Sequence, residues 1–157
     1  MRTLLLELRP SALMETGLSD LLHQLGEAAA GRAGVPVSVR VSGDCILPPD
    51  VHVVLYRIAQ EALNNVVKHA RPSEVQLRLH CAAGPGGGGR KVELEIRDDG
   101  RGFDPEGVAP DHLGLGIMRE RADTIGARLQ VETAAGSGTR VNLSWTEAPT
   151  AEGAAGR

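Results

Sequence analysis

The segment Tyr56–Ala70, with the sequence Y-R-I-A-Q-E-A-L-N-N-V-V-K-H-A, is the feature that most constrains how this chain can fold. Its apolar stripe recurs at helical spacing at Leu55, Ile58, Ala62 and Val66. This pattern predicts an amphipathic helix that packs against a core. Glu61, Asn65 and His69 follow one another at intervals of four residues. The row of Glu61 and Asn65 runs along the edge of the apolar stripe.

Polar groups at the rim of a core are costly unless a polar partner covers them. The side-chain oxygens of Glu61 and Asn65 suit a hard cation such as Mg²⁺, with a phosphate behind it. The alternative is a helix with a polar border and no ligand, and this helix alone favours that alternative.

The composition predicts one soluble domain in the cytoplasm. The chain has 157 residues, of which 41% are hydrophobic, 24% charged and 2% aromatic, so the core must consist of aliphatic residues. A net charge of −3 argues against a nucleic-acid-binding surface. No apolar run is long enough to span a bilayer, and the first residues do not have the pattern of a signal peptide. Cys45 and Cys81 lack metal or redox spacing and are expected to be reduced and packed.

The two ends of the chain differ from its middle. The leucine run Met1–Arg9 stops at Pro10, and we expect it to be the end of a helix that begins before residue 1. We therefore predict the end of a preceding helix and a linker over 1–14, and a folded domain over 15–146. Residues 147–157 are small and polar, which predicts a disordered tail.

Periodicity predicts further elements around the central helix, which opens at Pro48-Pro49-Asp50. A helix is expected over 17–30, with Gly31 ending it, and another from about residue 113. Alternation of apolar residues predicts strands over 35–41, 75–80, 92–96, 128–133 and 139–145. The glycine-rich 84–89 is expected to be a hairpin loop, and 103–112 a surface loop that forms a small lid.

The third predicted strand runs directly into Asp98-Asp99-Gly100. Asp98 shares the even positions of Leu94 and Ile96, so its carboxylate should point to the buried face while Asp99 points outward. A buried carboxylate needs a hydrogen-bond donor, and the exocyclic amine of a purine would be one. A plain D-D-G turn is the alternative.

Two later segments have the same double interpretation. The sequence H-L-G-L-G-I over 112–117 opens a helix with two glycines, so backbone N–H groups could approach an anion there, or the glycines could be only a loose cap. Thr139 lies on the inward face of the last strand together with Val141 and Leu143, which fits either a structural hydroxyl or a contact to adenine.

Together these segments resemble the ATP-binding domain of sensor histidine kinases, within the gyrase, Hsp90, histidine kinase and MutL (GHKL, or Bergerat-fold) superfamily. E-A-L-N-N-V-V-K-H-A resembles the N box, D-D-G-R-G-F the first glycine box, G-L-G-I the second, and G-S-G-T-R-V (Gly136–Val141) the third. Order and spacing match over residues 15–146. Leu8-Arg9-Pro10, the K-H-A ending and G-L-G-I-M-R-E-R-A resemble the NarX- and DesK-like subfamily, whose partners are NarL-type response regulators.

The resemblance implies a two-layer α/β (α+β) sandwich, in which a mixed sheet of about five strands carries helices on one face and ATP lies between the helices and the lid. Asn65 would bind Mg²⁺, and Glu61 would orient groups at the phosphates or reach the metal through water. Lys68 and His69 would lie near the phosphates. Asp98 would accept the adenine amino group. The other implied contacts to the nucleotide are Gly100, Gly102, Gly114, Leu115, Gly116 and Thr139.

The implied function is donation of the γ-phosphoryl of Mg-ATP to a histidine on a dimerisation hairpin that this chain lacks. The isolated chain would then be a monomer unable to phosphorylate itself. His23 follows the hairpin region and lacks an acidic neighbour, so we expect a surface histidine. One alternative is a free-standing anti-sigma-factor-type serine kinase or binding module of the same fold. Another is a degenerate nucleotide-binding scaffold, against which Asn65 and Asp98 both argue.

Overall fold

The computed structural model describes residues 17–43, 47–83, 89–100, 113–133 and 136–147. Its elements are α3 (Leu18–Ala33), β1 (Val37–Ser42), α4 (Pro49–Asn65), the π-helix η1 (Val66–Ala70), β2 (Val75–Ala83), β3 (Arg90–Asp98), α5 (Leu113–Thr124), β4 (Arg128–Thr133) and β5 (Thr139–Thr146). The leucine run at the start, the predicted lid 103–112 and most of the predicted tail lie outside the described residues. Glu147, the first residue of that tail, is described and its carboxylate accepts a hydrogen bond from the Arg90 N–H at 3.0 Å.

The strands form one mixed sheet in the order β1-β2-β3-β5-β4. β1 and β2 are parallel, and the other neighbouring pairs are antiparallel. Parallel neighbours need a crossover connection, and α4 provides it between β1 and β2. The antiparallel pairing of β2 with β3 confirms the predicted hairpin.

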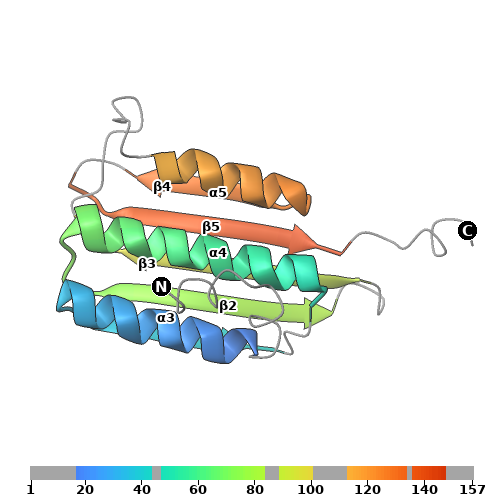
Figure 1. Ribbon diagram of the computed structural model, residues 1–157, viewed down its shortest axis with the longest axis horizontal. Helices are drawn as coiled ribbons and strands as arrows, with labels where there is room; N and C mark the ends of the chain where they lie inside the picture. The colour runs from blue at the N-terminus through green and yellow to red at the C-terminus, as the bar shows by residue number, and fades with distance from the viewer. Residues whose placement is uncertain (1–16, 44–46, 84–88, 101–112, 134–135, 148–157) are drawn as a thin grey trace, which may run out of the picture.

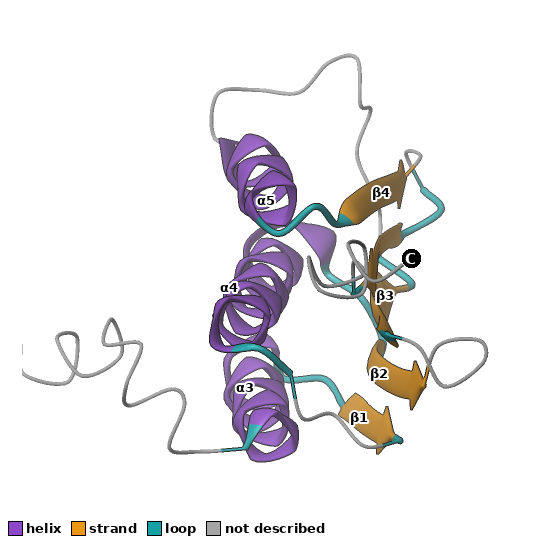
Figure 2. Cartoon of the chain, turned by 90° about the vertical axis from the view of Figure 1, so that its right-hand side faces the viewer, coloured by secondary structure: helices purple, strands orange, loops and turns teal. Residues whose placement is uncertain are grey.

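The helices α3, α4 and α5 form a single layer on one face of the sheet (Figures 1 and 2). This arrangement confirms the predicted two-layer sandwich with a mixed five-stranded sheet. Within the described residues, no helix is long and apolar enough to cross a membrane.

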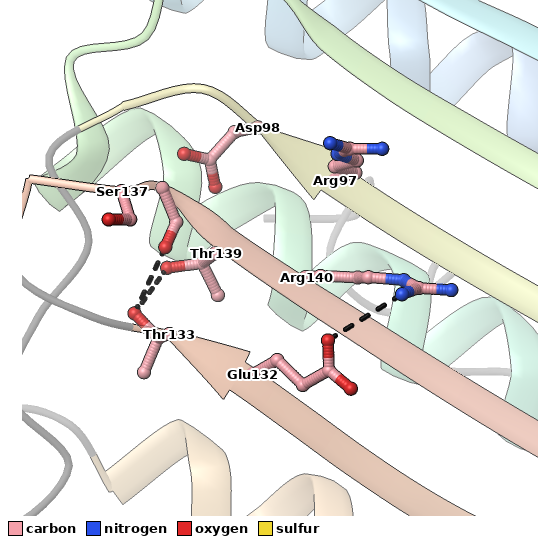
Figure 3. A pocket seen from close by; sticks show the side chains of 8 residues that line it. Arg97, Asp98, Glu132, Thr133, Ser137, Thr139 and Arg140 are labelled. Atoms are coloured by element: carbon pink, nitrogen blue, oxygen red, sulfur yellow. Dashed lines mark hydrogen bonds and ion pairs between the residues drawn. The ribbon is translucent and has the colours of Figure 1, made fainter.

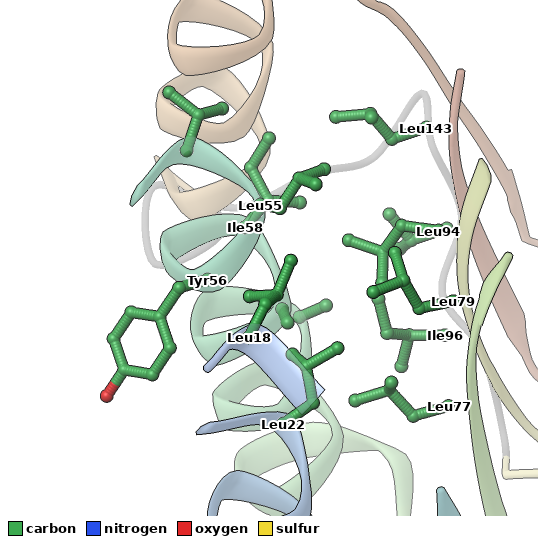
Figure 4. Close-up of a cluster of buried hydrophobic side chains, with 14 of the residues drawn as sticks. Leu18, Leu22, Leu55, Tyr56, Ile58, Leu77, Leu79, Leu94, Ile96 and Leu143 are labelled. Carbon is green, nitrogen blue, oxygen red and sulfur yellow. The ribbon is translucent and has the colours of Figure 1, made fainter. Parts of the chain in front are cut away.

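The core fills the space between the helices and the sheet (Figure 4). Leu55 and Ile58 of α4 are fully buried, as are Leu79 of β2 and Leu94 of β3. Each such side chain stabilises the fold by about 1.5–3 kcal/mol relative to an exposed position. In Figure 4, Tyr56 lies on the side of α4 away from the sheet.

Two details of the sequence interpretation are wrong. α3 does not end at Gly31 but continues to Ala33, and Gly34 ends it in a left-handed conformation with φ of 74°. The Gly34 N–H donates to the Ala30 carbonyl at 2.8 Å, which satisfies one of the free carbonyls at the helix end. Cys81 is buried as predicted, but it is disulfide-bonded rather than reduced.

Candidate functional site

One end of the molecule brings together chain segments that are far apart in the sequence. β3 ends there at Asp98, which is paired with Thr139 at the start of β5. Thr133 at the end of β4 pairs with Thr139 from the other side. The C-terminal end of α4 and the first turn of α5 lie at the same end (Figure 1). The described parts of the four motifs therefore lie at this end of the fold.

Asp98 is the buried acid of this end, with 5% of its surface exposed. Its Oδ1 accepts the Gly100 N–H at 2.7 Å. Burial raises the pKa of Asp98, the nearby charge of Asp99 adds to this, and hydrogen bonds from the backbone of Gly100 and Thr139 oppose it. The predicted orientation is confirmed, since Asp98 is buried and Asp99 is exposed. A desolvated carboxylate held by backbone N–H groups can accept a further hydrogen bond from an amine.

Gly138 makes the contact between the third glycine segment and Asp98 possible. Its φ is 81°, and a Cβ at this position would lie 2.3 Å from the Asp98 carbonyl oxygen and 3.1 Å from the Asp99 Cα. Any side chain would push the turn before β5 away from the end of β3. The sequence interpretation assigned no role to Gly138, although the G-S-G-T pattern could have indicated a close backbone approach.

Thr139 takes part in a small hydroxyl cluster beside Asp98 (Figure 3). Its Oγ1 lies 2.9 Å from the Thr133 Oγ1. The Thr133 hydroxyl also donates to the Gly138 carbonyl at 3.3 Å. Thr133 is a further residue that the sequence interpretation missed, because only its register opposite Thr139 brings it to the site.

A cavity of about 370 Å³ opens at this edge of the sheet. Its lining comprises Arg97, Asp98, Glu132, Thr133, Ser137, Gly138, Thr139 and Arg140. Strand alternation puts Arg97, Glu132 and Arg140 on the face away from the helices. The cavity is therefore lined by residues from both faces of the sheet, at the end where β3 and β4 stop and β5 starts. Of the residues predicted for the site, Asp98 and Thr139 line it, whereas Glu61, Asn65 and Lys68 do not.

The α4 residues form the helix side of this end. Glu61 and Asn65 are both half-buried, and Lys68 in η1 is exposed. The Asn64 Oδ1 accepts a hydrogen bond from Arg32 Nη2 of α3 at 2.7 Å, which ties the last turns of the two helices together. A carboxylate and a carboxamide supply the hard oxygen donors that Mg²⁺ takes alongside phosphate oxygens and water. These two residues could therefore hold Mg²⁺ together with phosphate oxygens.

The remaining predicted residues lie next to, or outside, the residues that the structure describes. Gly100 is buried and donates to Asp98. Gly114 and Leu115 lie in the first turn of α5, as does Gly116, and a Cβ at Gly116 would meet nothing within 4 Å. Gly116 is also exposed, so an approaching group has room beside it. For His69 only the backbone is described, and Gly102 lies outside the described residues.

Comparison with known proteins gives one family. The sequence model of histidine kinase-, DNA gyrase B-, and HSP90-like ATPases matches residues 50–149. The sensor histidine kinase LiaS of Bacillus subtilis (strain 168) is 32% identical over 143 residues, which are 91% of this chain and 38% of LiaS. YhcY of the same organism is 33% identical over 144 residues, 91% of this chain and 35% of YhcY. ComP is 32% identical over 142 residues, 87% of this chain and 17% of ComP.

Solved structures agree with this result. The histidine kinase domain of the Erythrobacter litoralis EL346 blue-light activated histidine kinase is similar with a TM-score of 0.61 and 26% identity, over 81% of this chain and 59% of that chain. Full-length ShkA in complex with AMPPNP is similar with a TM-score of 0.60 and 24% identity, over 82% of this chain and 30% of that chain. The second similarity concerns the fold alone.

Proposed function

This chain belongs to the family of histidine kinase-, DNA gyrase B-, and HSP90-like ATPases, and from that membership we propose that it is the ATP-binding catalytic domain of a sensor histidine kinase. The chain spans well under half the length of the curated relatives it matches. The kinase activity of the whole protein, its substrates and its partners are therefore part of the proposal.

The observation that carries the proposal is the buried carboxylate of Asp98 at the open end of the sheet, held by the backbone of Gly100 and Thr139. A buried acid with a raised pKa lowers the stability of the ionised native state. A ligand that donates a hydrogen bond to this carboxylate offsets that cost. In this proposal the donor is the amino group of adenine. Thr139 adds a polar contact beside it.

The helix side would hold the phosphates. Asn65 and Glu61 supply oxygen atoms for Mg²⁺, and Lys68 supplies a positive charge near the γ-phosphoryl. Bound Mg²⁺ would neutralise charge on the phosphates. The protein then has to position the γ-phosphoryl in line with the acceptor and exclude water, which is the main demand of phosphoryl transfer.

We further propose that the acceptor is a histidine on a dimerisation hairpin that is separate from this domain. The phosphoryl group would then pass on to a NarL-type response regulator. The domain would act in the cytoplasm, where ATP is available. The curated relatives reported above are sensor histidine kinases and do not favour the anti-sigma-factor-type alternative. None of them tests the assignment to the NarX- and DesK-like subfamily.

The test mixes the purified chain with a separately supplied acceptor hairpin and labelled Mg-ATP. We expect label on the hairpin, loss of transfer in Asn65→Ala, and normal transfer in the matched control His23→Ala. His23 is an exposed residue of α3 whose ring bonds only the Ser19 carbonyl among its described partners. No transfer at saturating Mg-ATP would count against the catalytic role, and capture of a sigma factor would favour the alternative.

A further inference from the structure

The second half of the N box and the residue after it have an unusual backbone geometry. α4 changes from an α-helix to the π-helix η1 over Val66–Ala70, the segment that carries Lys68. Arg71 then adopts a left-handed conformation with φ of 48° and is the only non-glycine residue with a positive φ in the described part of the chain. π-Helical turns and left-handed non-glycine residues cost free energy, and they persist where the surrounding structure holds them.

Asp99 accepts hydrogen bonds from the two residues that follow this strained segment and precede β2. Its Oδ1 accepts the N–H groups of Ser73 at 2.8 Å and Glu74 at 3.1 Å. Its Oδ2 accepts the Ser73 hydroxyl at 2.7 Å. The hydrogen bond from the Ser73 side chain, followed by that from the Glu74 backbone, holds the pKa of Asp99 below its usual value. The carboxylate is therefore ionised at neutral pH, and hydrogen bonds to an ionised acceptor are the stronger kind.

Asp99 links the end of β3, which carries Asp98, to the segment that follows Lys68. Asp98, its neighbour, is buried on the helix side of the sheet, whereas Asp99 is exposed on the other side. Asp98 also pairs with Val75 at the start of β2. Five residues separate Lys68 from Glu74, and Pro72 within that stretch is buried. Asp99, which accepts the hydrogen bonds from Ser73 and Glu74, is therefore the direct chain neighbour of Asp98, the acid that would contact the adenine base.

We propose that Asp99 is a positioning residue, which sets the place of η1 and Lys68 relative to Asp98 by fastening Ser73 and Glu74 to the end of β3. This inference rests on the proposed ATP-binding function. In this proposal Asp99 acts through its hydrogen bonds to Ser73 and Glu74 and contacts neither the base nor the phosphates. Its loss should therefore weaken the contacts made to the phosphates while those made to the base remain.

The experiment compares the dissociation constants of Mg-ATP and adenosine by NMR titration, for the wild type and for Asp99→Ala, Asp99→Asn and Ser73→Ala. The preference for Mg-ATP over adenosine should fall at least fivefold in Asp99→Ala. It should stay within twofold of wild type in Asp99→Asn, because the Asn Oδ1 can still accept both backbone N–H groups and the amide can donate to the Ser73 hydroxyl. Ser73→Ala removes one of the three bonds and should reduce the preference by about twofold.

Glu93→Ala is the matched control, because Glu93 is an exposed carboxylate on the same face of β3, and its preference should equal that of the wild type. If a folded Asp99→Ala keeps the wild-type preference for Mg-ATP over adenosine, or loses affinity for both equally, the role of Asp99 is overturned. The proposed function would still stand in that case. If Asp99→Ala does not fold, an unchanged preference in Ser73→Ala overturns the role of Asp99. A wild type that binds Mg-ATP no better than adenosine would overturn the proposed function and this inference together.

Discussion

Replacing Gly138 by alanine should destabilise the fold and displace Asp98. The strand β5 can start beside Asp98 only because Gly138 has no side chain, since an added Cβ would lie 2.3 Å from the Asp98 carbonyl oxygen. The positive φ of this residue adds a second penalty, because side chains disfavour that backbone conformation. Both penalties act at the end of the sheet that carries the site.

The expected loss can be separated into two parts. A left-handed conformation costs a residue with a Cβ about 1–2 kcal/mol, and forcing a methyl group into close-packed structure costs about 1–3 kcal/mol more. Gly138→Ala should therefore lose about 2–5 kcal/mol. Gly136→Ala is the matched control, because Gly136 has a φ of 84° but a Cβ there would meet nothing within 4 Å. It should lose only about 1–2 kcal/mol.

The assay is urea denaturation followed by far-ultraviolet circular dichroism, with the midpoint and slope compared across the wild type and both variants. We expect similar slopes and a clearly lower midpoint for Gly138→Ala than for Gly136→Ala. ATP affinity should also fall in Gly138→Ala at temperatures where it is folded, because the turn moves Asp98. Equal midpoints for the two variants would refute the close approach of Gly138 to the end of β3.

Three further predictions concern the acid, the helix end and the core. Burial raises the pKa of Asp98, so the contribution of Asp98 to stability should fall as the pH rises above about 4, and denaturation at pH 4 and 7 should show Asp98→Asn gaining stability relative to the wild type at the higher pH. Gly31→Ala should stabilise α3 by about 0.5–1 kcal/mol, whereas Gly34→Ala, at a left-handed helix end, should destabilise it by about 1 kcal/mol, as read from their thermal midpoints. Leu55→Ala should cost about 2–5 kcal/mol in urea denaturation, since Leu55 is fully buried.

Periodicity predicted the secondary structure within a few residues because each element has one buried face. The alternation of Leu94, Ile96 and Asp98 predicted that this acid would be inside, and the structure confirms it. The spacing of Leu55 and Ile58 likewise predicted the inner face of α4. In both cases the information is local, so the sequence contains it.

The remaining features depend on contacts between distant segments. Alternation indicates which face of a strand is buried but not which strand lies beside it, so the insertion of β5 between β3 and β4 could not be derived from it. The same holds for the approach of Gly138 to Asp98 and for the bonds of Asp99 to Ser73. The π-helical turn η1 was also missed, because V-V-K-H-A continues the apolar pattern of an ordinary α-helix.

The most direct test of the account is a calorimetric titration of ATP, with Mg²⁺ present, into the wild type and into Asp98→Asn at a pH where both are folded. We predict binding by the wild type and an affinity at least about a hundredfold lower for Asp98→Asn, because its amide can present a donor to the adenine amino group in place of an acceptor. Equal affinities for the two proteins would contradict the assignment of Asp98, and absence of binding by the wild type would contradict the nucleotide site itself.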